Sequence, residues 1–265
     1  MNDDSTVPIT RFPIDVDTRG PGGTTNAYLV DGLLVDPAAR VPEIDTTDVD
    51  AVAVTHTHPD HVGGVADYAT DADATVYAHA DHADRFREAT GVDPDKTVSD
   101  GERVGDRNVS VLETPGHATD HVAFAVGESG ARTDRDALVG DLAVAEGSVV
   151  VGGTDGDLRA YLDSLERVRD AGFRRLYPGH GPAIEDPVTT CQRLIDHRLD
   201  REASVLAAVE DGAETVDDVV DAAYEKDLTG VEDLARVTVM AHLEKLVADG
   251  RIDGTWADRR RSDGP

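Results

Sequence analysis

The chain has 265 residues, of which 39% are hydrophobic and 4% aromatic, and it carries a net charge of −29. This length suits one large domain, or a domain of about 200 residues with a small appendage. No stretch approaches the ~18 to 20 apolar residues of a membrane span, and the N-terminal segment lacks the pattern of a secretory signal. A single cysteine, Cys191, excludes an intramolecular disulfide and fits a reducing compartment. Together these observations lead us to expect a cytoplasmic protein without membrane segments.

The negative charge has two interpretations. Aspartate (40 residues) far outnumbers lysine (3 residues), and the acidic residues are spread over the whole chain. A basic partner would account for such a surface, but its even distribution favours adaptation to molar salt. The composition resembles that of proteins from salt-accumulating halophilic archaea. At about 1 M salt the screening length is only about 3 Å, which weakens the self-repulsion.

Strands joined by short turns are predicted along most of the chain. Asp31 and Gly32 lie between two apolar runs, which is a strong hairpin signal. Apolar spacing predicts helices near 65–68, over 82–88 and over 157–171, the last ending at Gly172. The apolar runs that predict strands are 26–30, 33–35, 51–55, 74–78, 109–113, 122–126, 137–139 and 175–177.

The pattern changes near residue 188. Helices are predicted over 188–210, 216–225 and 231–249, followed by a short hairpin arm over 251–256. Three helices and a β arm in about 60 residues are typical of a winged-helix-like module. We therefore predict that residues 1–190 form the main domain and residues 191–265 a helical linker with a winged-helix-like C-terminal domain. This domain could also act as a dimerisation element or a substrate lid.

The densest group of chemically active residues is the sequence Thr-His-Thr-His-Pro-Asp-His at 55–61. It directly follows an apolar strand, and Pro59 with Gly63 and Gly64 indicates a loop rather than a helix face. Imidazole and carboxylate groups together suit zinc and related divalent ions. Three further turns place such a group after an apolar run and beside glycine, at His117, Asp141 and His180.

In this order, the motifs THTHPDH, PGH, GD and PGHG resemble the metallo-β-lactamase superfamily, over roughly residues 20–190. The resemblance implies a four-layer αββα sandwich of the α/β class with a site for two zinc ions, or for Mn²⁺ or Fe²⁺, at one edge. It implies that His56, His58 and His117 hold one ion, that Asp60, His61 and His180 hold the other, and that Asp141 bridges them.

The C-terminal part also resembles one branch of that superfamily, the β-lactamase-like 2 proteins with a C-terminal winged-helix domain. Some members of this branch are endoribonucleases that act on single-stranded RNA. Two departures stand out: the loop after Leu34 reads Val-Asp-Pro-Ala-Ala where relatives carry Asp-Thr-Gly, and the tail is far more acidic.

The expected reaction is hydrolysis by a hydroxide that bridges two metal ions. Two adjacent cations lower the pKa of a bound water to about 7 and stabilise the developing oxyanion. Asp60 is the predicted catalytic residue, because it could orient this hydroxide and transfer its proton besides binding metal. His121 is expected to orient a ligand by a hydrogen bond.

Three functions fit these residues. The favoured one is a hydrolase of esters or thioesters; an endoribonuclease on single-stranded RNA is the alternative. A third is a nucleic-acid-binding regulator whose front domain senses metal. Residues 199–258 hold 16 acidic and 5 basic residues, a net charge of −11, which counts against phosphate contacts made by the C-terminal region.

Overall fold

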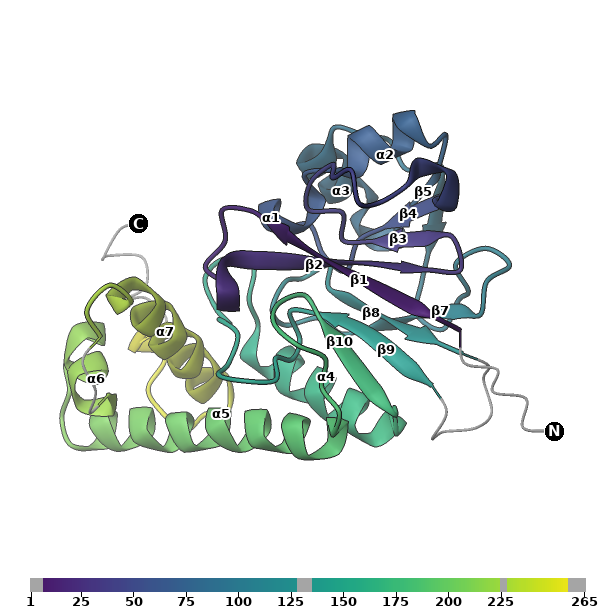
Figure 1. The fold of residues 1–265 in the computed structure, drawn as a ribbon. Helices are drawn as coiled ribbons and strands as arrows, with labels where there is room; N and C mark the ends of the chain where they lie inside the picture. The colour runs from purple at the N-terminus through teal and green to yellow at the C-terminus, as the bar shows by residue number, and fades with distance from the viewer. Residues whose placement is uncertain (1–6, 128–134, 225–227, 257–265) are drawn as a thin grey trace.

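Two β-sheets packed face to face form the centre of the molecule (Figure 1). The computed structural model describes residues 7–127, 135–224 and 228–256. The six-stranded sheet contains, in spatial order, β1 (Ile9–Asp15), β2 (Thr24–Val30), β3 (Leu33–Val35), β4 (Ala51–Ala53), β5 (Thr75–His79) and β6 (Lys96–Val98). The four-stranded sheet contains β10 (Arg175–Pro178), β9 (Asp136–Gly140), β8 (Val122–Val126) and β7 (Val109–Glu113).

Strand direction decides where the loops gather. In the first sheet β3, β4, β5 and β6 are parallel, whereas β1 and β2 pair antiparallel. In the second sheet β9 and β10 are parallel, and β8 is antiparallel to both β7 and β9. The loops that follow β7, β9 and β10 therefore leave the same edge of their sheet, which is where open α/β sheets place ligands.

The strands are buried on both faces, because one face of each sheet packs on the other sheet and helices cover the opposite face. Between the sheets, side chains such as Tyr28 and Leu33 pack against Phe124 and Leu138. The helices α2 (Val65–Asp71) and α3 (Ala83–Thr90) cover the outer face of the six-stranded sheet. The helix α4 (Leu158–Ala171) and the start of α5 (Pro187–Glu210) cover the four-stranded sheet. This is the predicted αββα order of layers.

The C-terminal helices share a second core. The 24-residue helix α5 contributes Cys191 and Leu194 to the main domain, and Val205 to a separate cluster with α6 (Val216–Ala223) and α7 (Glu232–Ala248). In Figure 1, α5 runs along the lower edge of the molecule and connects the two parts. The helix α5 is continuous through residues 190 and 191, so no break in the chain marks the predicted domain boundary there. The boundary therefore stays a prediction.

The predicted hairpin arm over 251–256 is wrong. These residues form bends and a short helical turn, and they contain no strand. The Asp253 carboxylate accepts a hydrogen bond from the backbone of Thr255, which favours the turn over a strand ladder. Trp256 is buried in the core of the C-terminal helices. Within residues 228–256 no wing strand is therefore present, and Glu225 of the predicted second helix lies outside the described residues.

The remaining helical segments are short. The helix α1 (Pro59–Val62) begins inside the segment predicted as a loop, with proline at its first position. The 3-10 turns are η1 (Pro21–Gly23), η2 (Thr46–Asp48) and η3 (Ala80–His82). Among the described residues, none of the helices has the length and apolar composition needed to span a membrane.

Cys191 is expected to be unreactive in the native protein. Its side chain is fully buried, and burial raises the pKa of the thiol to about 12, although Arg169 opposes this shift. The thiolate is the reactive form, so a thiol reagent such as 5,5′-dithiobis(2-nitrobenzoic acid) should label no cysteine in the folded chain and one in denaturant. Stoichiometric labelling of the native protein would contradict the buried position.

Candidate metal centre

Seven candidate ligands come from five segments that meet at one edge of the sheets. His56 and His58 follow β4, and Asp60 and His61 lie on the single turn of α1. The other three lie after strands of the second sheet: His117 after β7, Asp141 directly after β9 and His180 after β10. The sheets are tied together here, because the backbone N–H of Val122 donates to the carbonyl of Thr55.

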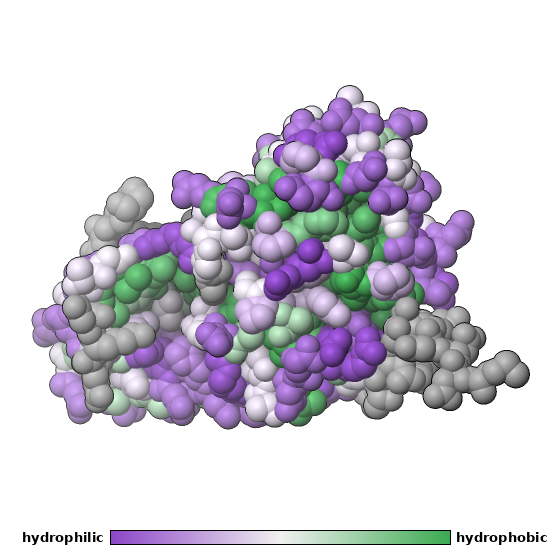
Figure 2. Space-filling model, viewed as in Figure 1, coloured by the Kyte–Doolittle hydropathy of each residue, from purple (hydrophilic) through white to green (hydrophobic). Residues whose placement is uncertain are grey.

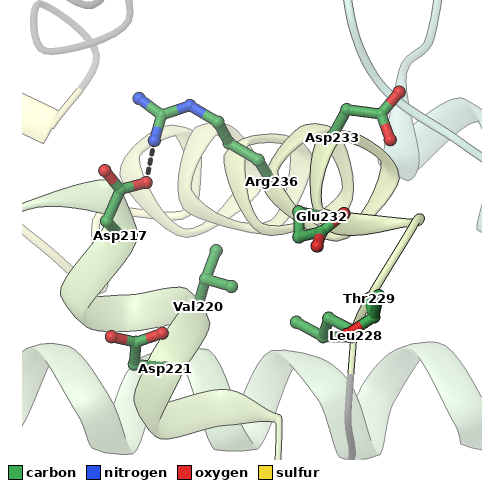
Figure 3. A pocket seen from close by; sticks show the side chains of 8 residues that line it. All are labelled: Asp217, Val220, Asp221, Leu228, Thr229, Glu232, Asp233 and Arg236. Atoms are coloured by element: carbon green, nitrogen blue, oxygen red, sulfur yellow. Dashed lines mark hydrogen bonds and ion pairs between the residues drawn. The ribbon is translucent and has the colours of Figure 1, made fainter.

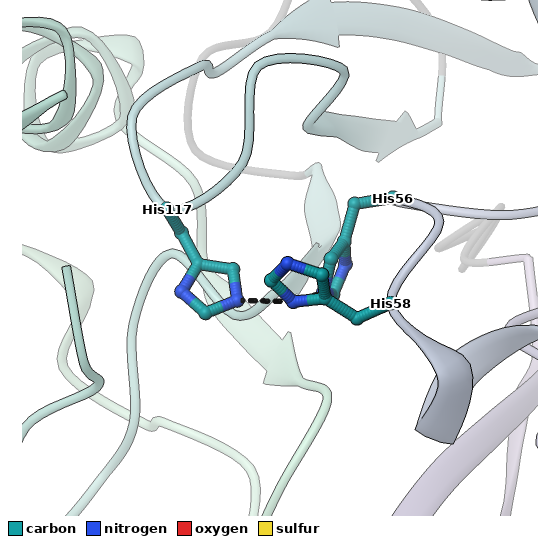
Figure 4. A group of neighbouring side chains, drawn as sticks. All are labelled: His56, His58 and His117. Atoms are coloured by element: carbon teal, nitrogen blue, oxygen red, sulfur yellow. Dashed lines mark hydrogen bonds between the residues drawn. The ribbon is translucent and has the colours of Figure 1, made fainter. Parts of the chain in front are cut away.

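Three imidazoles converge in the first group. Figure 4 shows His56, His58 and His117 with their rings directed at one another. The Nδ1 atom of His58 lies 3.0 Å from the Nε2 atom of His56 and 3.0 Å from the Nε2 atom of His117. Convergent nitrogen atoms at this separation are the arrangement that a tetrahedral cation site requires.

A second group lies beside the first. One ligand atom from each of Asp60, His61 and His180 falls within 4.8 Å of the others. Asp141 lies between the two groups: its Oδ2 atom is 3.5 Å from Nε2 of His117 and 3.4 Å from Nε2 of His180. Its Oδ1 atom lies 3.6 Å from Nε2 of His61. The Asp141 carboxylate thus faces both groups.

Outer hydrogen-bond partners fix the ring orientations. The Nδ1 atom of His61 lies 3.1 Å from Asp36, and that of His117 lies 2.8 Å from the carbonyl of Val150. His180 is held in the same way, with its Nδ1 atom 2.8 Å from the carbonyl of Thr24. His58 is reversed: its Nε2 atom lies 3.1 Å from Asp155 and its Nδ1 atom points inward. Such partners fix the tautomer and leave the other nitrogen available to a metal.

Glycines let the backbone approach this crowded centre. A Cβ atom on Gly20 would lie 2.5 Å from the ring of His180, and one on Gly179 would lie 2.6 Å from Oδ1 of Asp141. Gly140 has φ +45° and lies against the side chains of Thr55 and His121. Gly20 and Gly179 are therefore required by close contact with ligand candidates, and Gly140 by close contact with Thr55 and His121.

Mutual interactions shift the pKa values of these groups. Burial and the neighbouring imidazoles lower the pKa of His56 well below 6.5. Burial also lowers the pKa of His61, but Asp36 and Asp141 outweigh it and raise that pKa to about 9. The pKa of Asp141 is held well below its usual range, because the histidines around it outweigh the effect of burial. Without cations, the cluster thus keeps a proton on His61 opposite the carboxylates.

The donor set fits two divalent cations. The buried Nε2 atom of His61 and Oδ1 atom of Asp141 have no hydrogen-bond partner within the described residues. Leaving such atoms unpaired costs free energy, which coordination to a metal would offset. Imidazoles with carboxylates match zinc, and also Mn²⁺ and Fe²⁺.

Sequence reasoning missed three supporting side chains. Asp36 lies directly after β3 and accepts hydrogen bonds from the backbone and hydroxyl of Thr55, at 2.6 and 2.8 Å. Thr18 donates to Asp60 over 2.5 Å. Asp155 receives two hydrogen bonds from Arg85, and its pKa is lowered to about 2 because these bonds and those from Thr119 outweigh burial. For Asp36 the sequence did contain a signal, because this carboxylate directly follows an apolar run that predicts a buried strand.

His121 was expected to orient a ligand, and its position agrees. Its Nε2 atom accepts a hydrogen bond from the backbone N–H of Asp141 over 3.1 Å, and its Nδ1 atom lies 2.9 Å from the hydroxyl of Thr114. The ring is fully buried, which lowers its pKa to about 3 and keeps it neutral. His121 therefore fixes the backbone at the start of the Asp141 loop.

Comparison with known proteins identifies the family. Residues 20–180 match the sequence profile of the metallo-beta-lactamase superfamily. The chain belongs to the metallo-β-lactamase superfamily. A "Beta-lactamase-like protein 2 homolog" of Drosophila melanogaster is 32% identical over 219 residues, which is 78% of this chain and 72% of that protein. The corresponding protein of Caenorhabditis elegans is 30% identical over 208 residues, 77% of this chain and 67% of that protein.

Further relatives extend over most of the chain. An "Atrochrysone carboxyl ACP thioesterase" of Aspergillus chevalieri is 29% identical, covering 92% of this chain and 83% of the relative. A metallo-beta-lactamase family protein of Thermus thermophilus superimposes with a TM-score of 0.71 at 26% identity, covering 91% of this chain and 94% of that chain. The chain is thus a hydrolase of the metallo-β-lactamase fold.

Proposed function

We propose that this chain is a di-metal hydrolase of esters or thioesters. His56, His58 and His117 would hold one ion, Asp60, His61 and His180 the other, and Asp141 would bridge them. The observation that carries this proposal is the presence of two adjacent triads on either side of one buried carboxylate. Zinc is the metal that this donor set favours.

The chain's own residues would prepare the site for proton transfer. Two bound ions would supply Lewis-acid polarisation of the substrate and an activated water. The Asp60 carboxylate is half-buried and accepts a hydrogen bond from the Thr18 hydroxyl, which fixes its orientation. The Thr18 oxygen in turn accepts from the backbone of Gly20 over 3.0 Å. We assign Asp60 the role of orienting the attacking water and holding its proton.

Charge supports a small substrate over a nucleic acid. Hydrophilic side chains cover much of the face shown in Figure 2, including the surface of α5. A hollow of about 420 Å³ between α6 and α7 is lined by four carboxylates and one guanidinium, Arg236, which pairs with Asp217 (Figure 3). Such a surface repels phosphates. The fungal relative named as a thioesterase supports an acyl substrate.

A substrate panel tests this proposal. Purified protein with zinc, in molar KCl because the composition predicts a salt-rich cytoplasm, would receive acyl thioesters, carboxylic esters and single-stranded RNA. We expect thioester turnover, no RNA cleavage, and loss of turnover in Asp60→Asn. Chelator-sensitive RNA cleavage without thioester turnover would overturn the substrate assignment in favour of an endoribonuclease. Metal-independent turnover would overturn the di-metal mechanism.

A further inference from the structure

One loop supplies the outer partners of two ligand candidates. The segment between Val149 and Gly156 contributes the Val150 carbonyl, which lies 2.8 Å from Nδ1 of His117. The same segment contributes Asp155, whose carboxylate lies 3.1 Å from Nε2 of His58. This segment is therefore in contact with the first triad at two of its three imidazoles.

The loop rests on the C-terminal helices. The guanidinium of Arg198, on α5, donates to the carbonyl of Val149 from a position that is 2% exposed. Gly152 lies so close to α7 that a Cβ atom would be 2.7 Å from the carbonyl of Val237 and 3.1 Å from Ala241. The helices thus hold the loop at Val149 and at Gly152, on either side of the carbonyl that orients His117.

The far end of the loop is fixed from the main domain. Arg85 makes two hydrogen bonds to Asp155, and the backbone N–H and hydroxyl of Thr119 add bonds of 3.2 and 3.1 Å. The backbone of Asp157 donates to the carbonyl of Gly116 over 2.8 Å, which joins the loop to the turn that carries His117. Both ends of the loop are thereby held by contacts within the chain.

We propose that Asp155 and Arg198 are positioning residues for the first metal position, and that the C-terminal helices contribute to the site by holding the 149–156 loop. This inference rests on the proposed di-metal function. Outer partners of ligating histidines typically change metal affinity by about 10- to 100-fold when they are removed. Because the loop contacts His58 and His117 but, in the contacts described above, none of Asp60, His61 and His180, the effect should fall on one of the two ions.

Cobalt binding and imidazole tautomers test the proposal. Metal-free Asp155→Ala and Arg198→Met proteins would be titrated with Co²⁺ against a competing chelator. We expect two dissociation constants, of which one rises about 10- to 100-fold while the other changes less than about twofold. In long-range ¹H–¹⁵N spectra of the metal-free protein, His58 should carry its proton on Nε2, and Asp155→Ala should remove this preference. Arg198→Lys, which keeps a donor, should restore part of the affinity.

The matched control is Arg159→Gln. Arg159 forms an ion pair with Asp249 and so also joins the main domain to α7, but it makes no contact with the 149–156 loop among the interactions described. Its two cobalt constants should stay unchanged. Equal weakening of both constants in Asp155→Ala and Arg198→Met, or no change, would overturn the positioning role. A wild-type protein that takes up no cobalt would instead overturn the di-metal function itself.

Discussion

Asp141→Ala is expected to lose both metal ions and to lower hydrolysis about a thousandfold. The carboxylate faces His117 on one side and His180 and His61 on the other, at 3.4 to 3.6 Å. On the proposed assignment, its removal would take a shared ligand from both metal positions, and it leaves five imidazoles without the carboxylate that lies between them. Charge stabilisation by metal amounts to several kcal/mol, and each 1.36 kcal/mol corresponds to a tenfold change in rate. Metal analysis and steady-state turnover measure the two effects.

A matched control lies on β9, the strand that Asp141 directly follows. Asp136, at the opposite end of β9, is also buried and pairs with Arg174 rather than with histidine. Asp136→Asn should lower stability but keep two ions per chain and the turnover of the folded fraction. An Asp141→Ala protein that retains two ions and normal turnover would show that the bridging assignment is wrong.

Apolar sequence patterns predicted the strands whose formation depends on the residues within the strand itself. Short apolar runs predicted β4, β8 and β9 because strands covered on both faces must be apolar throughout. The pattern failed for β1, whose sequence ITRFPID is neither a continuous apolar run nor a regular alternation and contains Pro13. Proline is tolerated in β1 because this strand lies at the edge of the sheet. The predicted arm over 251–256 failed because a local aspartate cap decided the conformation.

The candidate ligands were predictable and their supports were not. His56, His58 and His61 stand in one dense motif, and glycine marks the turns of the others. Asp155 lies 97 residues from His58, and nothing in its surrounding sequence indicates that the two meet. The sequence around Arg198 gives no such indication either, because it shows only a charged residue on a predicted helix. The structure shows that this side chain is buried and donates to Val149. Contacts between distant segments depend on how the layers pack, which periodicity does not encode.

Metal removal is expected to abolish hydrolysis and to make stability depend on pH. A chelator should reduce turnover to background, and added Zn²⁺ should restore it, with Mn²⁺ and Fe²⁺ as comparisons. In the metal-free protein, the pKa of His61 is about 9, above its usual 6.5, so its protonated form stabilises the fold. This contribution is complete below pH 6.5 and is lost as the pH rises through 9, an effect of about 3 kcal/mol.

The opposite dependence holds at lower pH. Burial lowers the pKa values of His56, His117 and His121. As the pH falls below 6.5, these histidines therefore bind protons in the unfolded chain but not in the folded chain, which lowers the stability of the fold. Metal-free protein should therefore be most stable near pH 6.5, as measured by denaturant unfolding across pH 5 to 9.

The pKa of His180 is also raised, because Asp141 and the carbonyl of Thr24 outweigh its burial. In zinc-loaded protein the proposed ligation would replace the protons on His61 and His180, so the decline above pH 6.5 should disappear, and His61→Gln should reduce it in the metal-free protein. Metal-free protein that gains stability between pH 6.5 and 9 would contradict a protonated His61 at the centre of the site.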